Sequence, residues 1–189
     1  MQPSVRWSCP MIEGENVRLR GLELTDVDVF MQHWNNLKLR NYIADADRGP
    51  VSRTGEEEWV KNTWKESAEK KGYTFAIETI PDIRMIGATS LMRINWTSRS
   101  ALFGISIYDP QDWGKRYGRE ATRLLVQYAF NVLNLNRIEL EALDNNERAL
   151  RCYRAVGFKE VGRKRKSRYI DGEFRDEVIM DLLREEWKS

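Results

Sequence analysis

Hydrophobic residues alternate with polar ones along several short stretches of the chain, which is the pattern of strands that bury one face. The first such stretch is 16–24. Three strand-like stretches follow one another at 73–80, 84–94 and 100–110, and we expect the last two to pair antiparallel across a short turn. Another strand is predicted at 137–143. The segments between these groups show a different pattern.

Helical spacing of hydrophobic residues predicts helices in those segments. One helix is predicted to begin at Thr25, which would be its N-cap, with Asp28 completing a variant of the capping box. A second is predicted at 53–71, where acidic residues in the first turn and lysines in the last turn match the helix dipole. A shorter helix at 145–156 is predicted to end at Gly157.

The longest amphipathic pattern covers 115–133 and predicts a helix with one hydrophobic face. That face consists of Tyr117, Ala121, Leu124, Leu125, Tyr128, Val132 and Leu133. The stretch 157–183 has the pattern of a hairpin that turns at Asp171-Gly172, a type I′ signal. This order of elements predicts an α/β fold with helices packed on a mixed sheet, and the length favours a single domain over 1–189.

Composition narrows the class of protein. Of the 189 residues 41% are hydrophobic and 32% are charged, as in an ordinary globular domain. The sequence contains no run of eighteen apolar residues and no apolar core of a secretory signal at its start, so we expect neither a membrane helix nor export. A formal net charge of +2 gives no general preference for nucleic acid or a membrane surface.

Cysteine and histidine offer little chemistry. Cys9 and Cys152 lie far apart without a C-x-x-C motif, which favours free thiols and a cytoplasmic location. His33 is the single histidine, so the sequence supplies no cluster of zinc ligands, and we expect no metal site.

The loop before the helix at 115–133 combines glycine with positive charge. Gly114 and Gly118 lie at the predicted N-terminal end, where backbone N–H groups lack intrahelical partners and the helix dipole favours an anion. Three basic side chains add charge there: Lys115, Arg116 and Arg119. Basic residues are unfavourable at that end without a bound anion, so the loop indicates a pyrophosphate site. The alternative is a glycine loop followed by a solvated basic turn.

A second motif follows the strand at 137–143. Asn146, Ala149, Tyr153, Gly157 and Phe158 form N-x-x-A-x-x-x-Y-x-x-x-G-F. Together with the glycine loop, this arrangement resembles the GNAT superfamily of acetyl-CoA-dependent N-acetyltransferases. Over 15–187 the chain looks like the branch that includes ribosomal-protein-alanine and spermidine acetyltransferases. The resemblance implies the GNAT fold, whose mostly antiparallel central sheet is splayed at the cofactor site and flanked by helices.

The resemblance also implies how acetyl-CoA would bind. The pattern Q/R-x-x-G-x-G/A falls on 113–118, whose backbone N–H groups would hold the pyrophosphate. The strand segment 105–107 would pair with the pantetheine arm, Asn146 would contact the cofactor near its thioester, and Tyr153 would stand by the sulfur. The expected cofactor-binding residues are Ile105, Ser106, Ile107, Trp113, Gly114, Lys115, Arg116, Tyr117, Gly118, Arg119, Asn146 and Tyr153.

Three positions depart from the pattern. Trp113 replaces the usual Gln or Arg, and Arg116 replaces the first glycine. We expect Arg116 to be helical, where a side chain costs little. Leu102 stands where many relatives carry Glu, so the general base is unassigned. A water chain or a carboxylate elsewhere, such as the 56–58 run or Asp45, would have to accept the proton.

The mechanism implied is direct attack of a neutral primary amine on the thioester in a ternary complex. A strand N–H near Ile107 would stabilise the developing oxyanion, and Tyr153 would protonate the leaving thiolate. Tyr153 has a second interpretation as plain core, because it shares a helical face with hydrophobic residues. Cys152 is interpreted as a structural thiol, since no histidine lies nearby in sequence to activate it.

The acceptor is left open by the sequence. It is an amine, either of a protein N-terminus or of a small molecule such as a polyamine or an antibiotic, in a groove expected from 25–70 and 162–176. One rival hypothesis is a non-catalytic acyl-CoA-binding module. Another is an RNA-associated protein that uses the basic run at 162–168, although a solvated hairpin face explains that run as well. Homodimers are common in this branch, and the sequence locates no interface.

Overall fold

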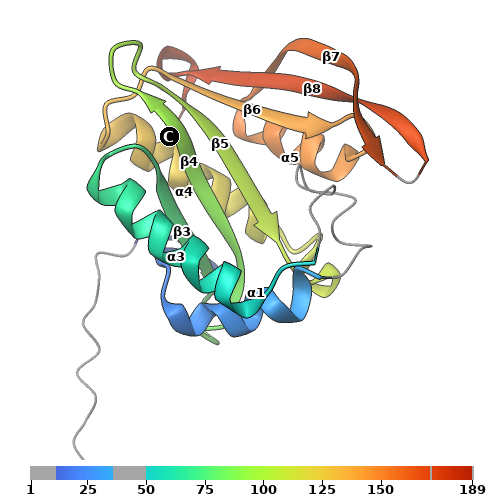
Figure 1. Cartoon of the computed structure of the whole chain (residues 1–189). Helices are drawn as coiled ribbons and strands as arrows, with labels where there is room; N and C mark the ends of the chain where they lie inside the picture. The colour runs from blue at the N-terminus through green and yellow to red at the C-terminus, as the bar shows by residue number, and fades with distance from the viewer. Residues whose placement is uncertain (1–11, 36–49, 171, 189) are drawn as a thin grey trace, which may run out of the picture.

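The computed structural model describes residues 12–35, 50–170 and 172–188 (Figure 1). Its strands form one sheet in the order β1-β2-β3-β4-β5-β6-β8-β7. The strands are β1 (Ile12–Glu13), β2 (Val17–Gly21), β3 (Tyr73–Thr79), β4 (Met85–Asn95), β5 (Ser100–Ile107), β6 (Arg137–Leu143), β7 (Lys159–Ile170) and β8 (Glu173–Leu183). The helices are α1 (Val27–His33), α3 (Arg53–Ala68), α4 (Tyr117–Asn131) and α5 (Glu147–Val156), with short 3-10 turns η1 (Leu24–Asp26), η2 (Pro110–Asp112) and η3 (Arg184–Glu186).

The helices cover both faces of the sheet and enclose two hydrophobic clusters (Figure 1). The larger cluster lies under α4 and α5, where buried side chains such as Leu125 and Leu150 meet Ile138 of β6. The smaller cluster lies under α1 and α3, where Phe30 and Val60 pack with Tyr108 at the end of β5. The sheet is therefore the middle layer of three, as the sequence predicted for helices packed on a mixed sheet.

Most pairs of neighbouring strands are antiparallel, including β4 with β5 as predicted. The exception is β5 with β6, which run parallel and pair only from Ser100 opposite Arg137 to Leu102 opposite Glu139. Beyond Leu102, β5 continues along β4, while β6 continues along β8. The sheet is thus splayed between β5 and β6, and the two strands are seen to diverge in Figure 1.

The start of the first helical segment was predicted wrongly. Helical structure begins two residues earlier than expected, with Glu23 instead of Thr25 as the N-cap, and the capping box joins Glu23 and Asp26 instead of Thr25 and Asp28. The Glu23 N–H donates to the Asp26 carboxylate at 2.8 Å. Arg20 of β2 also binds this carboxylate with both guanidinium ends, at 2.7 and 2.8 Å, so an ion pair with the preceding strand holds the capping residue.

The remaining boundaries shift by a few residues. The helix predicted at 53–71 ends at Ala68, and the one predicted at 115–133 covers Tyr117–Asn131. The strand 137–143 is confirmed, and Gly157 ends α5 with a φ of 117°. Asp171 of the predicted turn lies outside the described residues, as do Asp45 and Cys9. Within the described parts of the chain, no helix has the length and apolar character needed to cross a membrane.

Candidate active site

The opening between β5 and β6 exposes backbone groups of β5. The Tyr108 N–H donates to the Ile86 carbonyl of β4 at 2.9 Å, and the register of the two strands continues without a shift to Met92 opposite Leu102. Since neighbouring residues of an antiparallel strand point their backbone groups to opposite sides, Ile105 and Ile107 direct theirs into the opening. Ser106 directs its backbone groups to β4. Within the predicted segment 105–107, only the backbone groups of the two isoleucines therefore face the opening.

The glycine-containing loop before α4 lies next to this strand end, since its Trp113 indole N–H donates to the Ile107 carbonyl. Gly114 has a φ of 79° and Arg116 a φ of 68°, and α4 begins at Tyr117. The first helical bond runs from the Glu120 N–H to the Arg116 carbonyl, so the N–H groups of the residues before Glu120 have no intrahelical partner. Left-handed residues that alternate with others turn successive N–H groups to one side, and such turns bind anions. These residues fit a pyrophosphate group.

The expectation that Arg116 is helical is wrong. Its φ of 68° and ψ of 1° place it in the left-handed region, at the N-cap of α4. The loop needs this conformation to turn from η2 into the first turn of α4, and the glycine of the motif would adopt it without a Cβ penalty. With arginine the conformation costs about 1 kcal/mol.

The basic side chains of the loop are partly engaged within the protein. The Lys115 ammonium lies 3.2 Å from a carboxylate oxygen of Asp112, which is 3% exposed. Arg84 binds the same carboxylate with two hydrogen bonds of 2.7 and 2.8 Å. The Arg84 guanidinium holds the pKa of Asp112 below its usual value, with a smaller contribution from Lys115. Arg119 donates weakly to the Ala155 carbonyl at 3.4 Å. Asp112 therefore anchors the base of the loop.

Trp113 connects this loop to both sides of the opening. Its indole N–H donates to the Ile107 carbonyl at 2.9 Å. On the other side, the Arg148 guanidinium of α5 lies over the indole ring, 3.5 Å from the ring centroid. Sequence reasoning missed Arg148. Its place two residues after the motif residue Asn146 was the available signal.

Tyr153 of α5 lies at the wall of the opening. Its ring contacts Phe103, the first residue of β5 beyond the last pair with β6, and Phe158, with ring centroids 6.2 and 6.0 Å away. Tyr153 is 8% exposed, and burial raises the pKa of its hydroxyl well above the usual value. The two interpretations of Tyr153 thus coexist, because its ring belongs to the core and its position borders the opening.

Two other predicted residues have structural roles. Asn146 is the N-cap of α5, and its side-chain oxygen accepts a hydrogen bond from the Ala149 N–H at 3.2 Å. Cys152 packs against α4, where burial raises the pKa of its thiol to about 11, while a hydrogen bond with Thr122 and the charge of Arg119 lower it slightly. A thiol that stays protonated is a poor nucleophile, which agrees with the interpretation of Cys152 as structural.

A buried carboxylate lies on the α1 and α3 side of the sheet. Glu56, in the first turn of α3, is 6% exposed, and its charge helps raise the pKa of Tyr108, after the larger effect of burial. The Phe30 ring lies between two others: its centroid is 5.5 Å from that of Tyr108 and 5.2 Å from that of Trp59. This aromatic group at the C-terminal end of β5 was not predicted, because its members are scattered along the sequence.

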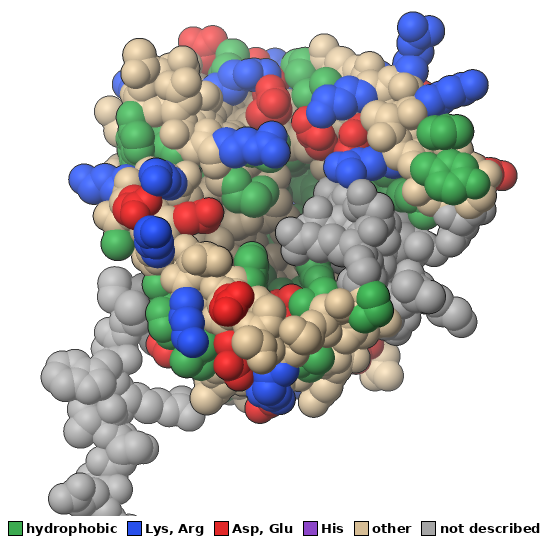
Figure 2. Space-filling model, in the orientation of Figure 1, with side chains coloured by type: hydrophobic (Ala, Val, Ile, Leu, Met, Phe, Trp, Pro, Cys, Tyr) green, Lys and Arg blue, Asp and Glu red, His purple; other side chains and the backbone are tan. Residues whose placement is uncertain are grey.

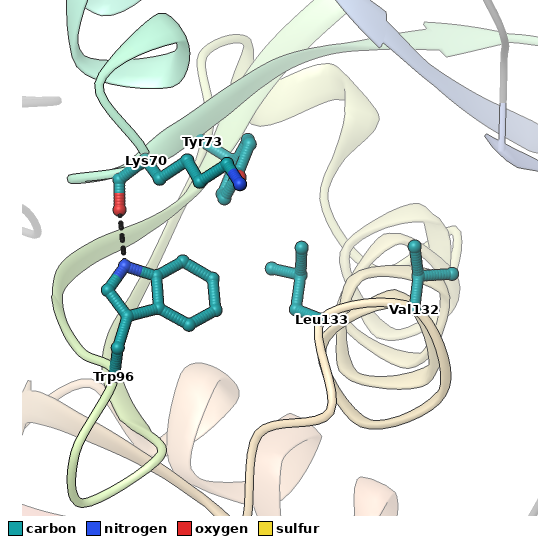
Figure 3. A pocket seen from close by; sticks show the side chains of 5 residues that line it. All are labelled: Lys70, Tyr73, Trp96, Val132 and Leu133. Carbon is teal, nitrogen blue, oxygen red and sulfur yellow. Dashed lines mark hydrogen bonds between the residues drawn. The ribbon is translucent and has the colours of Figure 1, made fainter.

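A separate pocket of about 410 Å³ lies at the other end of β5 (Figure 3). It is lined by Lys70, Tyr73, Trp96, Val132 and Leu133, and the indole N–H of Trp96 donates to the Lys70 carbonyl at 2.8 Å. None of the predicted site residues lines it. The pocket is therefore distinct from the opening.

Two features of the described residues bear on RNA and metal binding. Basic and acidic side chains are mixed across the face shown in Figure 2. Within the basic run, Arg163 pairs with Asp176 at 3.7 Å, Lys164 pairs with Glu141, and Arg168 pairs with Glu177 at 2.8 Å. Described residues 12–35, 50–170 and 172–188 contain no group of three potential metal ligands.

Comparisons with known proteins agree with this geometry. A spermidine N(1)-acetyltransferase of Vibrio cholerae is 29% identical over 170 residues, which cover 89% of this chain and 94% of the relative. A crystal structure of spermidine N-acetyltransferase from Vibrio cholerae in complex with CoA and spermine matches with a TM-score of 0.79 at 29% identity, covering 90% of this chain and 96% of that one. A ribosomal-protein-S5-alanine acetyltransferase from Vibrio fischeri shares the fold, with a TM-score of 0.80 at 20% identity over 95% of this chain and all of that one.

The family assignment rests on a match that covers most of the chain. Residues 16–159 match the acetyltransferase (GNAT) domain family, and this range holds the splayed strands, the glycine loop and the Asn146 to Phe158 motif. GNAT acetyltransferases use acetyl-CoA as the donor. The chain therefore belongs to the GNAT acetyltransferase family and is an acetyl-CoA-dependent N-acetyltransferase.

Proposed function

We propose that the protein acetylates a primary amine of a small polycationic acceptor of the polyamine class. The observation that carries this proposal is the buried Glu56 carboxylate beside the aromatic group at the end of β5. A buried carboxylate attracts an ammonium group through its charge, and aromatic rings in the same region can add a cation–π contact. The relatives named as spermidine acetyltransferases support the same class of acceptor.

The donor would bind in the opening between β5 and β6. Acetyl-CoA supplies an acetyl group that its thioester activates toward amines. The N–H groups at the start of α4, with the left-handed turn at Gly114 and Arg116, would hold its pyrophosphate. The backbone groups of Ile105 would pair with its pantetheine arm, as a further strand pairs with a sheet edge, while the Ile107 carbonyl is already bonded to the Trp113 indole.

The protein would assist transfer at two points. The Ile107 N–H would stabilise negative charge on the carbonyl oxygen. The Tyr153 hydroxyl would give its proton to the departing sulfur, and its raised pKa keeps that proton available across the physiological range. Transfer is direct in a ternary complex, because the raised pKa of Cys152 disfavours an acyl-cysteine. We infer a cytoplasmic location, since a reducing compartment suits the free Cys152 thiol.

The experiment is thiol release from acetyl-CoA with a panel of acceptors: spermidine, spermine, an aminoglycoside, and peptides with Ala, Ser or Met at the N-terminus. We expect turnover with the polyamines. Glu56→Gln should raise KM for spermidine about tenfold and leave KM for acetyl-CoA unchanged, because the lost charge lies on the acceptor side. Glu58→Gln, in the same turn but exposed, is the matched control and should change neither value by more than about twofold.

Other outcomes would redirect the proposal. Turnover with peptides but not polyamines would make a protein N-terminus the acceptor. A rise in melting temperature with acetyl-CoA and no turnover with any amine would favour the non-catalytic acyl-CoA-binding module. If acetyl-CoA neither binds nor reacts, the assignment of the opening as the donor site is wrong.

A further inference from the structure

Trp113 bridges the two walls of the opening at a position where the family pattern has Gln or Arg. On the β5 side its indole N–H binds the Ile107 carbonyl at 2.9 Å. On the α5 side its ring stacks with the Arg148 guanidinium, 3.5 Å from the ring centroid. A Gln or Arg side chain has no indole ring, so it could not make this pair of contacts.

The bond to Ile107 fixes the end of β5. Ile107 lies beyond the last residue of β5 that pairs with β6, so its carbonyl would otherwise face the opening without a strand partner. The indole N–H supplies a donor there, and the peptide between Ile107 and Tyr108 is then held on both sides, because its Tyr108 N–H also binds the Ile86 carbonyl. The end of β5, next to the N–H groups that would meet the donor, is therefore held in place.

The stack with Arg148 fixes the opposite wall. A planar guanidinium over an indole is a favourable cation–π contact, and its flat geometry constrains the distance between the two groups. Arg148 is in the first turn of α5, the helix that carries Tyr153. The stack thus ties the helix with the proposed acid to the strand with the proposed oxyanion donor.

Trp113 is also held by contacts away from the opening. Its ring packs against the smaller hydrophobic cluster, and its backbone N–H donates to the Pro110 carbonyl at 3.1 Å. The preceding residue, Asp112, is anchored by Arg84. The bridge is therefore attached to a rigid base.

We propose that Trp113 is a positioning residue that, through Ile107 and Arg148, sets the width of the opening around the pantetheine arm of the donor. This inference rests on the proposed function, because it assumes that CoA occupies the opening. It predicts a selective effect. Ligands with a pantetheine arm should depend on the bridge, whereas ligands that reach only the phosphate loop should not.

The test compares two ligands by isothermal titration calorimetry: CoA, and adenosine 3′-phosphate 5′-diphosphate, which has the same phosphates but no pantetheine. Trp113→Phe removes the indole N–H and keeps an aromatic ring. It should weaken CoA binding about fivefold and change binding of the nucleotide less than about twofold. Arg148→Lys keeps the charge and loses the planar stack, and we expect the same selective loss of CoA affinity.

Trp96→Phe is the matched control. Trp96 also donates its indole N–H to a backbone carbonyl, that of Lys70, at the remote pocket (Figure 3). This variant loses the same kind of hydrogen bond away from the opening and should bind both ligands as the wild type does.

Each other outcome is informative. If Trp113→Phe weakens the binding of both ligands equally, Trp113 acts only through the loop at 113–118. If both affinities are unchanged, the bridge does not set the width of the opening. Either result overturns the inference and leaves the proposed function standing, provided that the wild type binds CoA. Failure of the wild type to bind either ligand would overturn the proposed function as well.

Discussion

Arg116 combines an exposed side chain with a left-handed backbone. The effect of its charge and the effect of its backbone strain can therefore be measured separately. Arg116→Gly should stabilise the fold by about 1 kcal/mol, because glycine takes this conformation without strain. Arg116→Ala removes the same charge but keeps the Cβ, so it should not raise the melting temperature. Thermal unfolding checks the difference, which should be about 2 to 4 °C for a chain of this size.

The same pair of variants tests the charge. If Arg116 contacts phosphate, both variants should weaken CoA binding equally, since both lack the guanidinium. A loss in one variant alone would trace the effect to backbone conformation instead.

Tyr153 should be required for turnover and dispensable for folding. Tyr153→Phe keeps the ring that contacts Phe103 and Phe158 and removes the hydroxyl, so kcat should fall about 100-fold or more while the melting temperature changes little. Steady-state kinetics and thermal unfolding of the purified variant provide the check. Unchanged kcat would return Tyr153 to a purely structural role.

The pH dependence follows from the burial of Tyr153. Burial raises the pKa of its hydroxyl, so the acid remains protonated at and above the ordinary tyrosine value near 10. The acceptor amine, in contrast, must lose a proton to react. The wild-type rate should therefore rise with pH from 6 to 10 without a descending limb. A bell-shaped profile whose descending limb begins before pH 9 would contradict Tyr153 as the acid.

Cys152 should be chemically quiet. With its pKa raised to about 11, only about a thousandth of the thiol is ionised at pH 8, so its alkylation by iodoacetamide should be far slower than that of an exposed thiol. The measurement uses Cys9→Ser as the background, so that Cys152 is the single thiol. Cys152→Ala should retain turnover within about twofold, and a large loss of activity there would revive a covalent route.

At the scale of elements, Asp112, which anchors the base of the loop before α4, should contribute to stability in a pH-dependent way. Asp112→Asn should cost about 1 to 2 kcal/mol at neutral pH, a modest figure because Arg84 is half-exposed and solvent screens its side of the pair. The lowered pKa of Asp112 means that the stabilisation is full above the ordinary aspartate value near 4 and is lost as the pH falls through the lowered folded-state pKa. Urea unfolding of both proteins from pH 3 to 8 measures this, and a constant difference would contradict it.

The elements themselves were largely predictable, because their patterns are local. The alternation at 137–143 and the helical spacing with a glycine stop at Gly157 each depend on neighbouring residues alone. The start of the first helix was not, since Asp26 became the capping partner, and its ion pair with Arg20 of β2 has no signature in helical periodicity. Arg116 was mispredicted for a related reason, because the turn around it is imposed by the entry into α4 and not by its own preference.

At the scale of the whole molecule, the splayed sheet followed from the family resemblance, whereas the contacts that span the opening did not. The Trp113 stack with Arg148 and the proximity of Glu56 to Tyr108 join residues far apart in sequence, and no periodicity encodes such pairs. The expected homodimer stays a prediction.

The charge distribution predicts weak binding of RNA. Three of the basic residues in the run at 162–168 pair with acidic side chains of β6 and β8, so few charges are available for phosphate. We expect a dissociation constant for single-stranded RNA weaker than about 10 μM at 150 mM salt, in the range of non-specific contacts. Filter binding across a salt series measures it, and tight binding with a steep salt slope would support the RNA hypothesis.

The divergence of β5 and β6 has a consequence for how such a chain evolves. The proposed donor site is made of backbone, from strand pairing that stops at Leu102 and from the turn at Gly114 and Arg116. The proposed acceptor site is made of side chains on other elements, such as Phe30 of α1 and Glu56 of α3. Side-chain substitutions can therefore change the acceptor site while the backbone that would bind the donor stays the same. Proteins that share this donor site can in this way differ in their acceptors, and the aromatic and acidic side chains are the positions at which such differences are expected.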